Sequence, residues 1–164
     1  MFVRRASLAH RESDIAIRAF EPEETNLAAI KTNEVAYAAY QARNAPPGGP
    51  QRFIAIAREE AVSAYLRWPH EQADLRIGLT VNRPRSMYDL VLAGAGTAVL
   101  PCFVGDLEPR LQRVGGPIDS LRHGQWTVMN SNDRHRREIR LVVDRTTMLL
   151  KSHAELFAGK RPTY

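Results

Sequence analysis

The sequence predicts an α/β fold, and two observations lead to this prediction. Short apolar runs of strand length alternate along the chain with segments whose apolar residues recur at helical spacing. Proline, glycine and asparagine clusters separate these segments. The chain has 164 residues, 44% of them hydrophobic, so it can bury roughly two-thirds of its unfolded surface. This composition excludes a wholly disordered chain, a collagen-like repeat and a disulfide scaffold.

The first part of the chain is predicted to consist of strands. Residues 14–20 alternate apolar and polar side chains before a turn, and further strands are expected at 27–30 and 35–40. The apolar run 53–57 is too short for a helical pattern and is predicted to be a buried strand. Before it, the proline- and glycine-rich residues 44–50 indicate either a linker or a loop on one lobe.

The middle of the chain is predicted to alternate helix and strand. A helix is expected over 59–68, ending at Pro69, and a strand over 75–81. Ser86 is predicted to cap a helix over 87–93. Asp89, at the third helical position, is predicted to bond back to the N-cap residue.

The last part is predicted to hold two strands and a long helix. The strands are expected at 97–100, closed by Pro101, and at 126–129. The helix is expected over 134–157, and its apolar stripe includes His153, which we interpret as a core histidine. Leu141 and Met148 interrupt its polar face, so we expect them to contact a second surface, such as another subunit.

Catalytic and cofactor motifs are not recognisable. The glycines 94 and 96 follow a helix and precede a strand, the reverse of the order in a dinucleotide site. Cys102 has no histidine signature to act as its base, so a buried packing role is expected. The histidines lack metal-ligand spacing. We therefore expect no catalytic residue, no cofactor and no metal, and a protein that is not an enzyme.

The charged residues and the single cysteine indicate which ligands and which cell compartment to expect. The net charge is +5, and Lys31, Lys151 and Lys160 are the only lysines among 23 basic residues. Arginine suits bidentate capture of carboxylate or phosphate, although an arginine-biased genome also explains the bias. A single cysteine, no signal-peptide pattern and no apolar run of membrane-spanning length favour a soluble cytoplasmic protein. No membrane partner is expected.

A candidate anion site follows from the predicted elements. A helix that begins at Ser86 directly after a strand presents free amides beside the strand end, and Arg83 and Arg85 flank it. Ligands of open α/β sheets collect outside the carboxyl ends of strands. Arg18, Arg58 and Asn82 follow other predicted strands at such ends.

Four motifs in order resemble one bacterial family. Residues 92–102 read LAGAGTAVLPC, residues 12–18 ESDIAIR, residues 106–114 DLEPRLQRV, and residues 125–128 QWTV before the terminal helix. In this order and spacing they resemble the effector-binding domain of LysR-type transcriptional regulators. The resemblance covers nearly the whole chain.

The resemblance implies a type II periplasmic-binding-protein-like fold of two α/β lobes joined by two crossover strands. Lobe one would comprise residues 1–40 and 97–164 and would be incomplete, and lobe two would comprise 41–96. The implied function is the effector-binding module of a LysR-type regulator, with a small anionic molecule in the interlobe cleft. The expected ligand contacts are Arg18, Arg58, Asn82, Arg85, Ser86 and Pro101.

The resemblance also implies how the protein would contact DNA and other copies of itself. The family's winged helix-turn-helix domain is not recognisable in this sequence, so we expect contact with DNA only through such a domain outside it. The strand over 14–20 would lie at an open sheet edge, and a homo-oligomer is therefore expected. A stand-alone small-molecule-binding protein, or a small enzyme on the same fold, is the alternative function.

Overall fold

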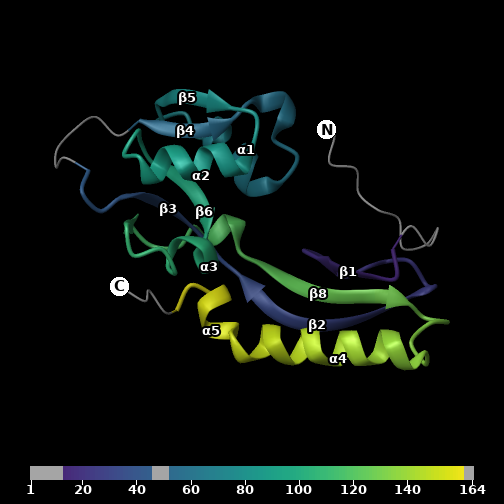
Figure 1. Cartoon of the computed structure of the whole chain (residues 1–164). Helices are drawn as coiled ribbons and strands as arrows, with labels where there is room; N and C mark the ends of the chain where they lie inside the picture. The colour runs from purple at the N-terminus through teal and green to yellow at the C-terminus, as the bar shows by residue number, and fades with distance from the viewer. Residues whose placement is uncertain (1–12, 46–51, 161–164) are drawn as a thin grey trace. The chain divides into compact units, whose positions relative to one another are not determined.

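The computed structural model describes residues 13–45 and 52–160 (Figure 1). The glycine-proline stretch at 46–50 and the N-terminal residues 1–12 lie outside the described residues. The chain divides into two compact units. Unit 1 comprises Met1–Val35 and His123–Ala154, and unit 2 comprises Ala36–Arg122 and Glu155–Tyr164. The lobes that the resemblance implies, 1–40 with 97–164 and 41–96, have other bounds: residues 36–40, 97–122 and 155–164 group with 41–96 in unit 2.

The chain combines strands with helices, which alternate between residues 53 and 114, and this confirms the α/β prediction. The strands are β1 (Ile15–Arg18), β2 (Leu27–Val35), β3 (Tyr37–Ala42), β4 (Phe53–Ile56), β5 (Ile77–Val81), β6 (Ala98–Pro101), β7 (Leu111–Val114) and β8 (His123–Asn130). The helices are α1 (Ala64–Glu71), α2 (Pro84–Leu92), α3 (Cys102–Gly105), α4 (Arg137–Ser152) and α5 (Ala154–Phe157). Short 3-10 turns lie at η1 (Arg58–Glu60) and η2 (Asp119–Leu121).

Unit 1 is an antiparallel sheet with one helix packed on it. The strand order is β1-β8-β2, and α4 packs against β2 and β8 (Figure 1). Its core joins Met129 of β8 to Ile139 and Val143 of α4, with Ile15 and Ala28 of the outer strands packed around them. Ala28 and Ile30, two residues apart on β2, both pack against this core, as the alternation of side chains along a strand requires.

The second strand is longer than predicted. The polar residues 31–34 separate two predicted strands, yet they belong to β2, which pairs with β8 as far as Val35. The register shifts between Lys31 and Asn33, so an irregularity in the ladder lets the strand continue. The hydrogen bonds of this part of β2 are made to β8, and the local hydrophobicity of the sequence does not predict them.

Unit 2 combines antiparallel and parallel strands. The order β6-β3-β7 is antiparallel, and β4 pairs with β5 in parallel. A bridge between Phe53 and Thr97 joins the two sheets in parallel. Helices α1 and α2 both pack against β4 and β6. The core contains fully buried Tyr40, Ile54 and Val91.

Two predicted helix boundaries are wrong. Helix α1 begins at Ala64 and includes Pro69, which is buried in a helix that packs against β4 and β6, so tertiary packing keeps the proline inside the last turn. The predicted helix over 134–157 is divided at His153 into α4 and α5. His153 is exposed instead of buried, and its ring nitrogen Nδ1 lies 3.0 Å from both Leu149 O and Ser152 Oγ at the end of α4.

The short segment after α4 packs within unit 2. The ring of Phe157 stacks on that of Phe103, with centroids 4.5 Å apart, and the Ala36 amide donates to Phe157 O at 2.9 Å. Arg113 Nη2 donates to Gly159 O at 3.0 Å. Within residues 13–45 and 52–160, no helix is long and apolar enough to span a membrane.

Candidate functional site

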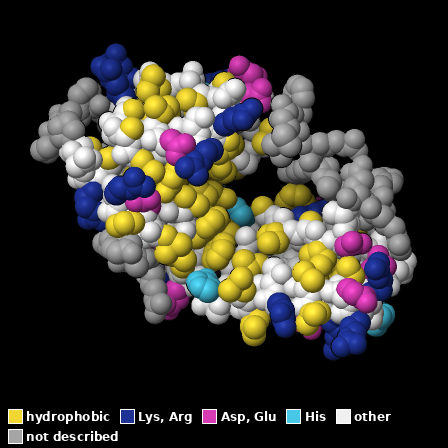
Figure 2. Space-filling model, in the orientation of Figure 1, with side chains coloured by type: hydrophobic (Ala, Val, Ile, Leu, Met, Phe, Trp, Pro, Cys, Tyr) yellow, Lys and Arg dark blue, Asp and Glu magenta, His cyan; other side chains and the backbone are white. Residues whose placement is uncertain are grey.

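The candidate site is a cavity of about 390 Å³ that lies wholly within unit 2. Its walls come from α1, the first turns of α2, the end of β6, and α3. Lining residues are Tyr65, Pro84, Arg85, Met87, Tyr88, Leu100, Pro101 and Val104. Figure 2 shows hydrophobic side chains, in yellow, gathered on the visible face of this unit. The wall is therefore mainly apolar, and Arg85 is the one charged group among these lining residues.

The cavity lies where strand ends and a helix start meet. Pro101 is the last residue of β6, and α2 follows β5 after a two-residue turn. Strands β4 and β5 are parallel, and β4 meets the start of β6 in parallel as well, so their carboxyl ends point the same way. This is the edge at which ligands of open α/β sheets bind.

The start of α2 differs from the prediction. The N-cap is Arg83 and Pro84 takes the first helical position, which its fixed φ favours, so Ser86 lies inside the first turn and caps nothing. Asp89 does not bond back to the N-cap residue either, because both of its carboxylate oxygens accept hydrogen bonds from Arg85 Nε, at 2.9 and 3.0 Å. The predicted capping box is therefore wrong.

The helix start still offers two amides. Proline has no N–H, and the first intrahelical bond is donated by the Met87 amide to Arg83 O at 3.1 Å. The amides of Arg85 and Ser86 precede it, and neither has a backbone acceptor in the described part of the chain. They carry the positive end of the helix dipole.

Arg85 is exposed and held by its own helix. Its side chain pairs with Asp89 one turn later, and its guanidinium carbon lies 5.7 Å from the centroid of the Tyr88 ring. The pair uses Nε, so the two terminal nitrogens face no partner within residues 13–45 and 52–160. These nitrogens can donate to a carboxylate or another anion.

A hydrogen-bond network fixes one wall. The Tyr88 hydroxyl donates to Glu108 Oε2 at 2.9 Å, and Arg110 donates to the same carboxylate through Nε at 2.7 Å and Nη2 at 2.9 Å. The hydrogen bonds from Arg110 are the main reason that the pKa of Glu108 falls to about 2. The carboxylate therefore stays charged at neutral pH and keeps the Tyr88 ring in place.

Stacked tyrosines hold a second wall. The rings of Tyr65 and Tyr37 lie 4.8 Å apart between centroids, and Tyr37 pairs with Pro101 across β3 and β6. Burial raises the pKa of Tyr37 to about 12 and also raises the pKa of Tyr65. Both rings therefore remain neutral in the physiological range.

The six predicted ligand contacts fall into three groups. Arg85 and Pro101 line the cavity, and Ser86 follows in the same helical turn. Arg58 and Asn82 belong to unit 2 but do not line it: Arg58 Nη2 donates to His70 O at 3.3 Å, and Asn82 is exposed between β5 and α2. Arg18 belongs to unit 1, where it pairs with Glu24 at 3.2 Å.

Sequence reasoning missed most of the apolar wall. Tyr65, Met87, Tyr88 and Val104 lie on helices, and their periodicity is that of ordinary core residues. The available signal was the pair of aromatic residues at 65 and 88, each on a short helix that adjoins a strand end. That signal does not distinguish a ligand wall from a core.

Cys102 belongs to a buried polar cluster and lies outside the cavity wall. It is fully buried, as predicted, and burial raises the pKa of its thiol. Close to it, the Tyr40 hydroxyl donates to Asp106 Oδ1 at 2.8 Å, and Arg113 donates to both oxygens of Asp106. A protonated buried thiol is a poor nucleophile. No group of three or more potential metal ligands occurs among the described residues.

The chain is similar in structure to LysR-type regulatory domains. The regulatory domain of CrgA from Neisseria meningitidis matches with a TM-score of 0.59 and 18% identity, over 90% of this chain and 78% of that one. The bromide-bound regulatory domain of HypT from Salmonella typhimurium matches with a TM-score of 0.62 and 15% identity, over 88% and 75%. Full-length CbnR complexed with its target DNA matches with a TM-score of 0.57 and 14% identity, over 85% and 55%.

These likenesses confirm the fold that the sequence motifs implied. The chain has the type II periplasmic-binding-protein-like fold of LysR regulatory domains. It spans about three-quarters of the matched regulatory domains and about half of full-length CbnR. No protein-family model matches the sequence, and no curated protein matches it.

Proposed function

We propose that the chain is the effector-binding module of a LysR-type transcriptional regulator and takes a small anionic molecule in the cavity of unit 2. The observation that carries this proposal is the cavity's composition. One arginine, whose terminal nitrogens have no partner among the described residues, and two helix amides, which have none there either, lie beside a wall of tyrosine, methionine, leucine, proline and valine. Such a site fits a molecule with one anionic group and an apolar body.

The comparisons support the proposal in kind. The matched HypT domain is described as bromide-bound, and a halide is an anion of the sort that free amides and an arginine attract. CbnR is described as a regulator in complex with its target DNA. For this chain, DNA contact is assigned to a separate winged helix-turn-helix domain, and the protein is expected in the bacterial cytoplasm.

Three further residues at strand ends remain proposed ligand contacts. Arg18 lies at the end of β1, Asn82 after β5 and Arg58 after β4, all of them strand ends. Arg58 and Arg18 would have to leave their present partners, His70 and Glu24, to make these contacts.

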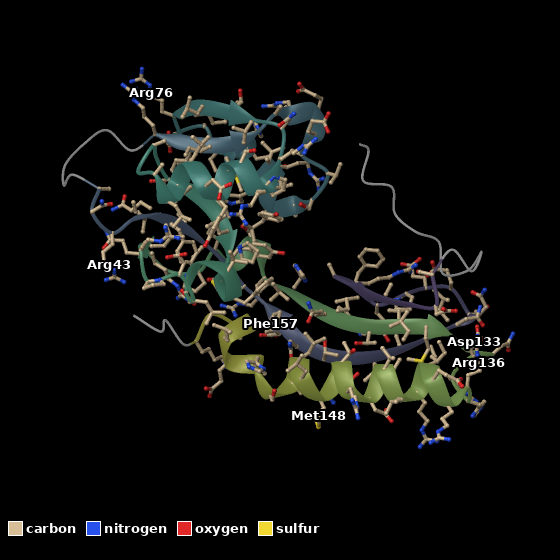
Figure 3. All side chains as sticks on the ribbon, viewed as in Figure 1. Arg43, Arg76, Asp133, Arg136, Met148 and Phe157 are labelled. Atoms are coloured by element: carbon tan, nitrogen blue, oxygen red, sulfur yellow. The ribbon has the colours of Figure 1, made fainter. Side chains whose placement is uncertain are left out.

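A thermal-shift screen tests the function. The compounds are halides and small aliphatic and aromatic carboxylic acids. Each acid is compared with its neutral amide. We expect at least one acid to raise the melting temperature, its amide to do less, and Arg85→Ala to remove the difference. Arg76→Ala, an exposed arginine of unit 2 outside the cavity (Figure 3), should change nothing.

The alternative function is a stand-alone binding protein or a small enzyme on the same fold. An enzyme requires turnover of a bound compound that is lost on changing Cys102 or a histidine. A binding protein without a regulatory role requires that no winged helix-turn-helix coding sequence adjoin the gene in frame. Turnover of any compound that stabilises the protein would overturn the regulatory proposal.

A further inference from the structure

Asn33, Thr127 and Thr147 bury polar side-chain atoms that have no hydrogen-bond partner among the residues the structure describes. These atoms are both amide atoms of Asn33 on β2, the hydroxyl of Thr127 on β8 and the hydroxyl of Thr147 on α4. Asn33 is 5% exposed and Thr127 is fully buried. A buried polar atom without a partner is costly to the folded state, so a partner for these atoms is expected. We call the three residues the Asn33 cluster.

The strand register places Asn33 and Thr127 side by side on the face that α4 covers. Gln125, Thr127 and Met129 alternate along β8, so their side chains share one face of the sheet. Met129 packs against α4 in the core of unit 1, so this is the buried face. Asn33 pairs with Gln125 across the two strands. It is therefore a diagonal neighbour of Thr127 on that face.

The irregularity in β2 is what turns Asn33 toward α4. Lys31 lies over the ring of Trp126, on the opposite face of the sheet, and residues two apart in a regular strand share a face. The register shifts between Lys31 and Asn33, which reverses the alternation and turns Asn33 to the buried side. A local feature of the strand therefore brings a polar side chain under the helix.

Thr147 belongs to the packed face of α4. It lies four residues after Val143, which itself lies four after Ile139, so the three side chains form one row along the helix. The chain turns back after β8, so α4 runs antiparallel to it (Figure 1). The turn after Val143 therefore lies toward the start of β8, where the other two side chains of the cluster are. A helical threonine often donates to the carbonyl one turn earlier, and the Thr147 hydroxyl does not.

The chemistry of these atoms indicates the kind of ligand. The amide offers a donor group and an acceptor, and each hydroxyl offers both. All of them are neutral, so they match neither a metal ion, which needs carboxylate or carbonyl oxygens in number, nor an anion. Reversing the amide does not help, because both of its ends lack a partner. The side chain paired with Asn33, Gln125, already accepts from the Thr32 hydroxyl at 3.4 Å.

We propose that the Asn33 cluster is a binding site for one buried water molecule that bridges α4 to the sheet of unit 1. Water is both a donor and an acceptor, and a buried water typically makes about three hydrogen bonds, one for each side chain of the cluster. The core contacts of α4 come from Ile139 and Val143, in its first half. The water therefore holds the second half of the helix on the sheet.

Oxygen-17 relaxation dispersion of the solvent tests the proposal, because it counts long-lived waters inside a protein and is blind to exchanging hydroxyl protons. A chain of 164 residues holds roughly six buried waters, so the readout is a difference between variants. We expect the double variant Asn33→Leu, Thr127→Val to lose the contribution of about one water. Thr146→Val should lose none. Thr146 is the matched control on α4, since its hydroxyl is not buried without a partner.

Hydrogen exchange separates a bridging water from a dry cluster. Thr147→Val keeps the shape of the side chain and removes one bond to the water, so the amides of residues 147–151 should exchange about two- to tenfold faster. In a dry cluster the same change removes an unpaired hydroxyl, and exchange slows. Thr146→Val should leave these amides unchanged.

Three results would overturn the proposal. One is unchanged or slower exchange in Thr147→Val. Another is equal relaxation dispersion in the wild type and in a double variant whose circular dichroism shows it folded. The last is a crystal structure in which Asn33 bonds directly to Thr127. Because Thr147→Val is nearly isosteric, the exchange test holds even where the double variant does not fold.

Discussion

Tyr88 and Glu108 join the cavity wall to the loop that precedes β7, through a hydrogen bond of 2.9 Å between the tyrosine hydroxyl and Oε2. Arg110 holds the same carboxylate from the other side. The hydroxyl therefore turns away to a fixed acceptor, which leaves the ring as the surface that Tyr88 presents to the cavity.

Glu108→Gln is expected to lower the free energy of unfolding by about 1 kcal/mol, the usual size of a charged pair near the surface. Because the pKa of Glu108 is lowered to about 2, its stabilisation is present above the unfolded value of about 4.3 and is lost as the pH falls toward 2. Urea unfolding of both proteins between pH 7 and pH 2 measures this. Their difference should shrink toward acid, and a constant difference would contradict the assignment.

Arg113→Leu should cost about 3–5 kcal/mol, because the buried carboxylate of Asp106 would lose its cation. Tyr40→Phe removes one donor to Asp106 and should cost about 1–2 kcal/mol. Arg76→Leu, an exposed control, should change stability by less than about 0.5 kcal/mol. Chemical denaturation ranks the three variants, and equal losses in Arg113→Leu and Arg76→Leu would refute the buried pair.

Alkaline pH should unfold the protein together with ionisation of its core tyrosines. The pKa of Tyr37 is raised to about 12 and that of Tyr40 is raised also, chiefly by burial. Stability is therefore unaffected below the unfolded value of about 10 and falls as the pH rises from there toward 12. Absorbance at the phenolate band and circular dichroism should change together. If all tyrosines ionise at about pH 10.5, close to the pKa of an unfolded tyrosine, while the protein stays folded, the burial of Tyr37 and Tyr40 is contradicted.

Self-association is expected through β1. This strand pairs with β8 only, so within the described residues its other edge is unpaired, and Ile17 is about half exposed. An unpaired edge invites strand addition from a second chain. Sedimentation should show an assembly that Ile17→Lys weakens and that Met148→Asp leaves intact. A monomer at high concentration would mean that the edge is covered within one chain.

Local patterning predicts much of this fold. The short apolar runs that became β4 and β6 and the alternation that became β1 appear in the sequence as they do in the structure. The predictions for residues 31–34 and for Pro69 were wrong, because residues 31–34 continue a strand that pairs with β8 and Pro69 is buried in a helix that packs on β4 and β6. Such contacts join residues far apart in the sequence, and no window of local composition contains them.

The site was predictable only in its polar part. Arg85 follows from a helix start after a strand, although Pro84 and not Ser86 determines where that helix begins. The tyrosine, methionine and valine side chains of the wall have the spacing of core residues, so only the packing of α1, α2 and α3 distinguishes them.

The most direct test is to observe where a ligand binds. The acid that most raises the melting temperature is titrated into nitrogen-15-labelled protein while amide resonances are followed. We predict that the amides of Arg85, Ser86 and Val104 shift with one common affinity, and that Arg85→Ala weakens this affinity while Arg76→Ala does not. Shifts confined to residues outside the cavity, or a screen in which no acid stabilises the protein, would contradict the proposed effector site.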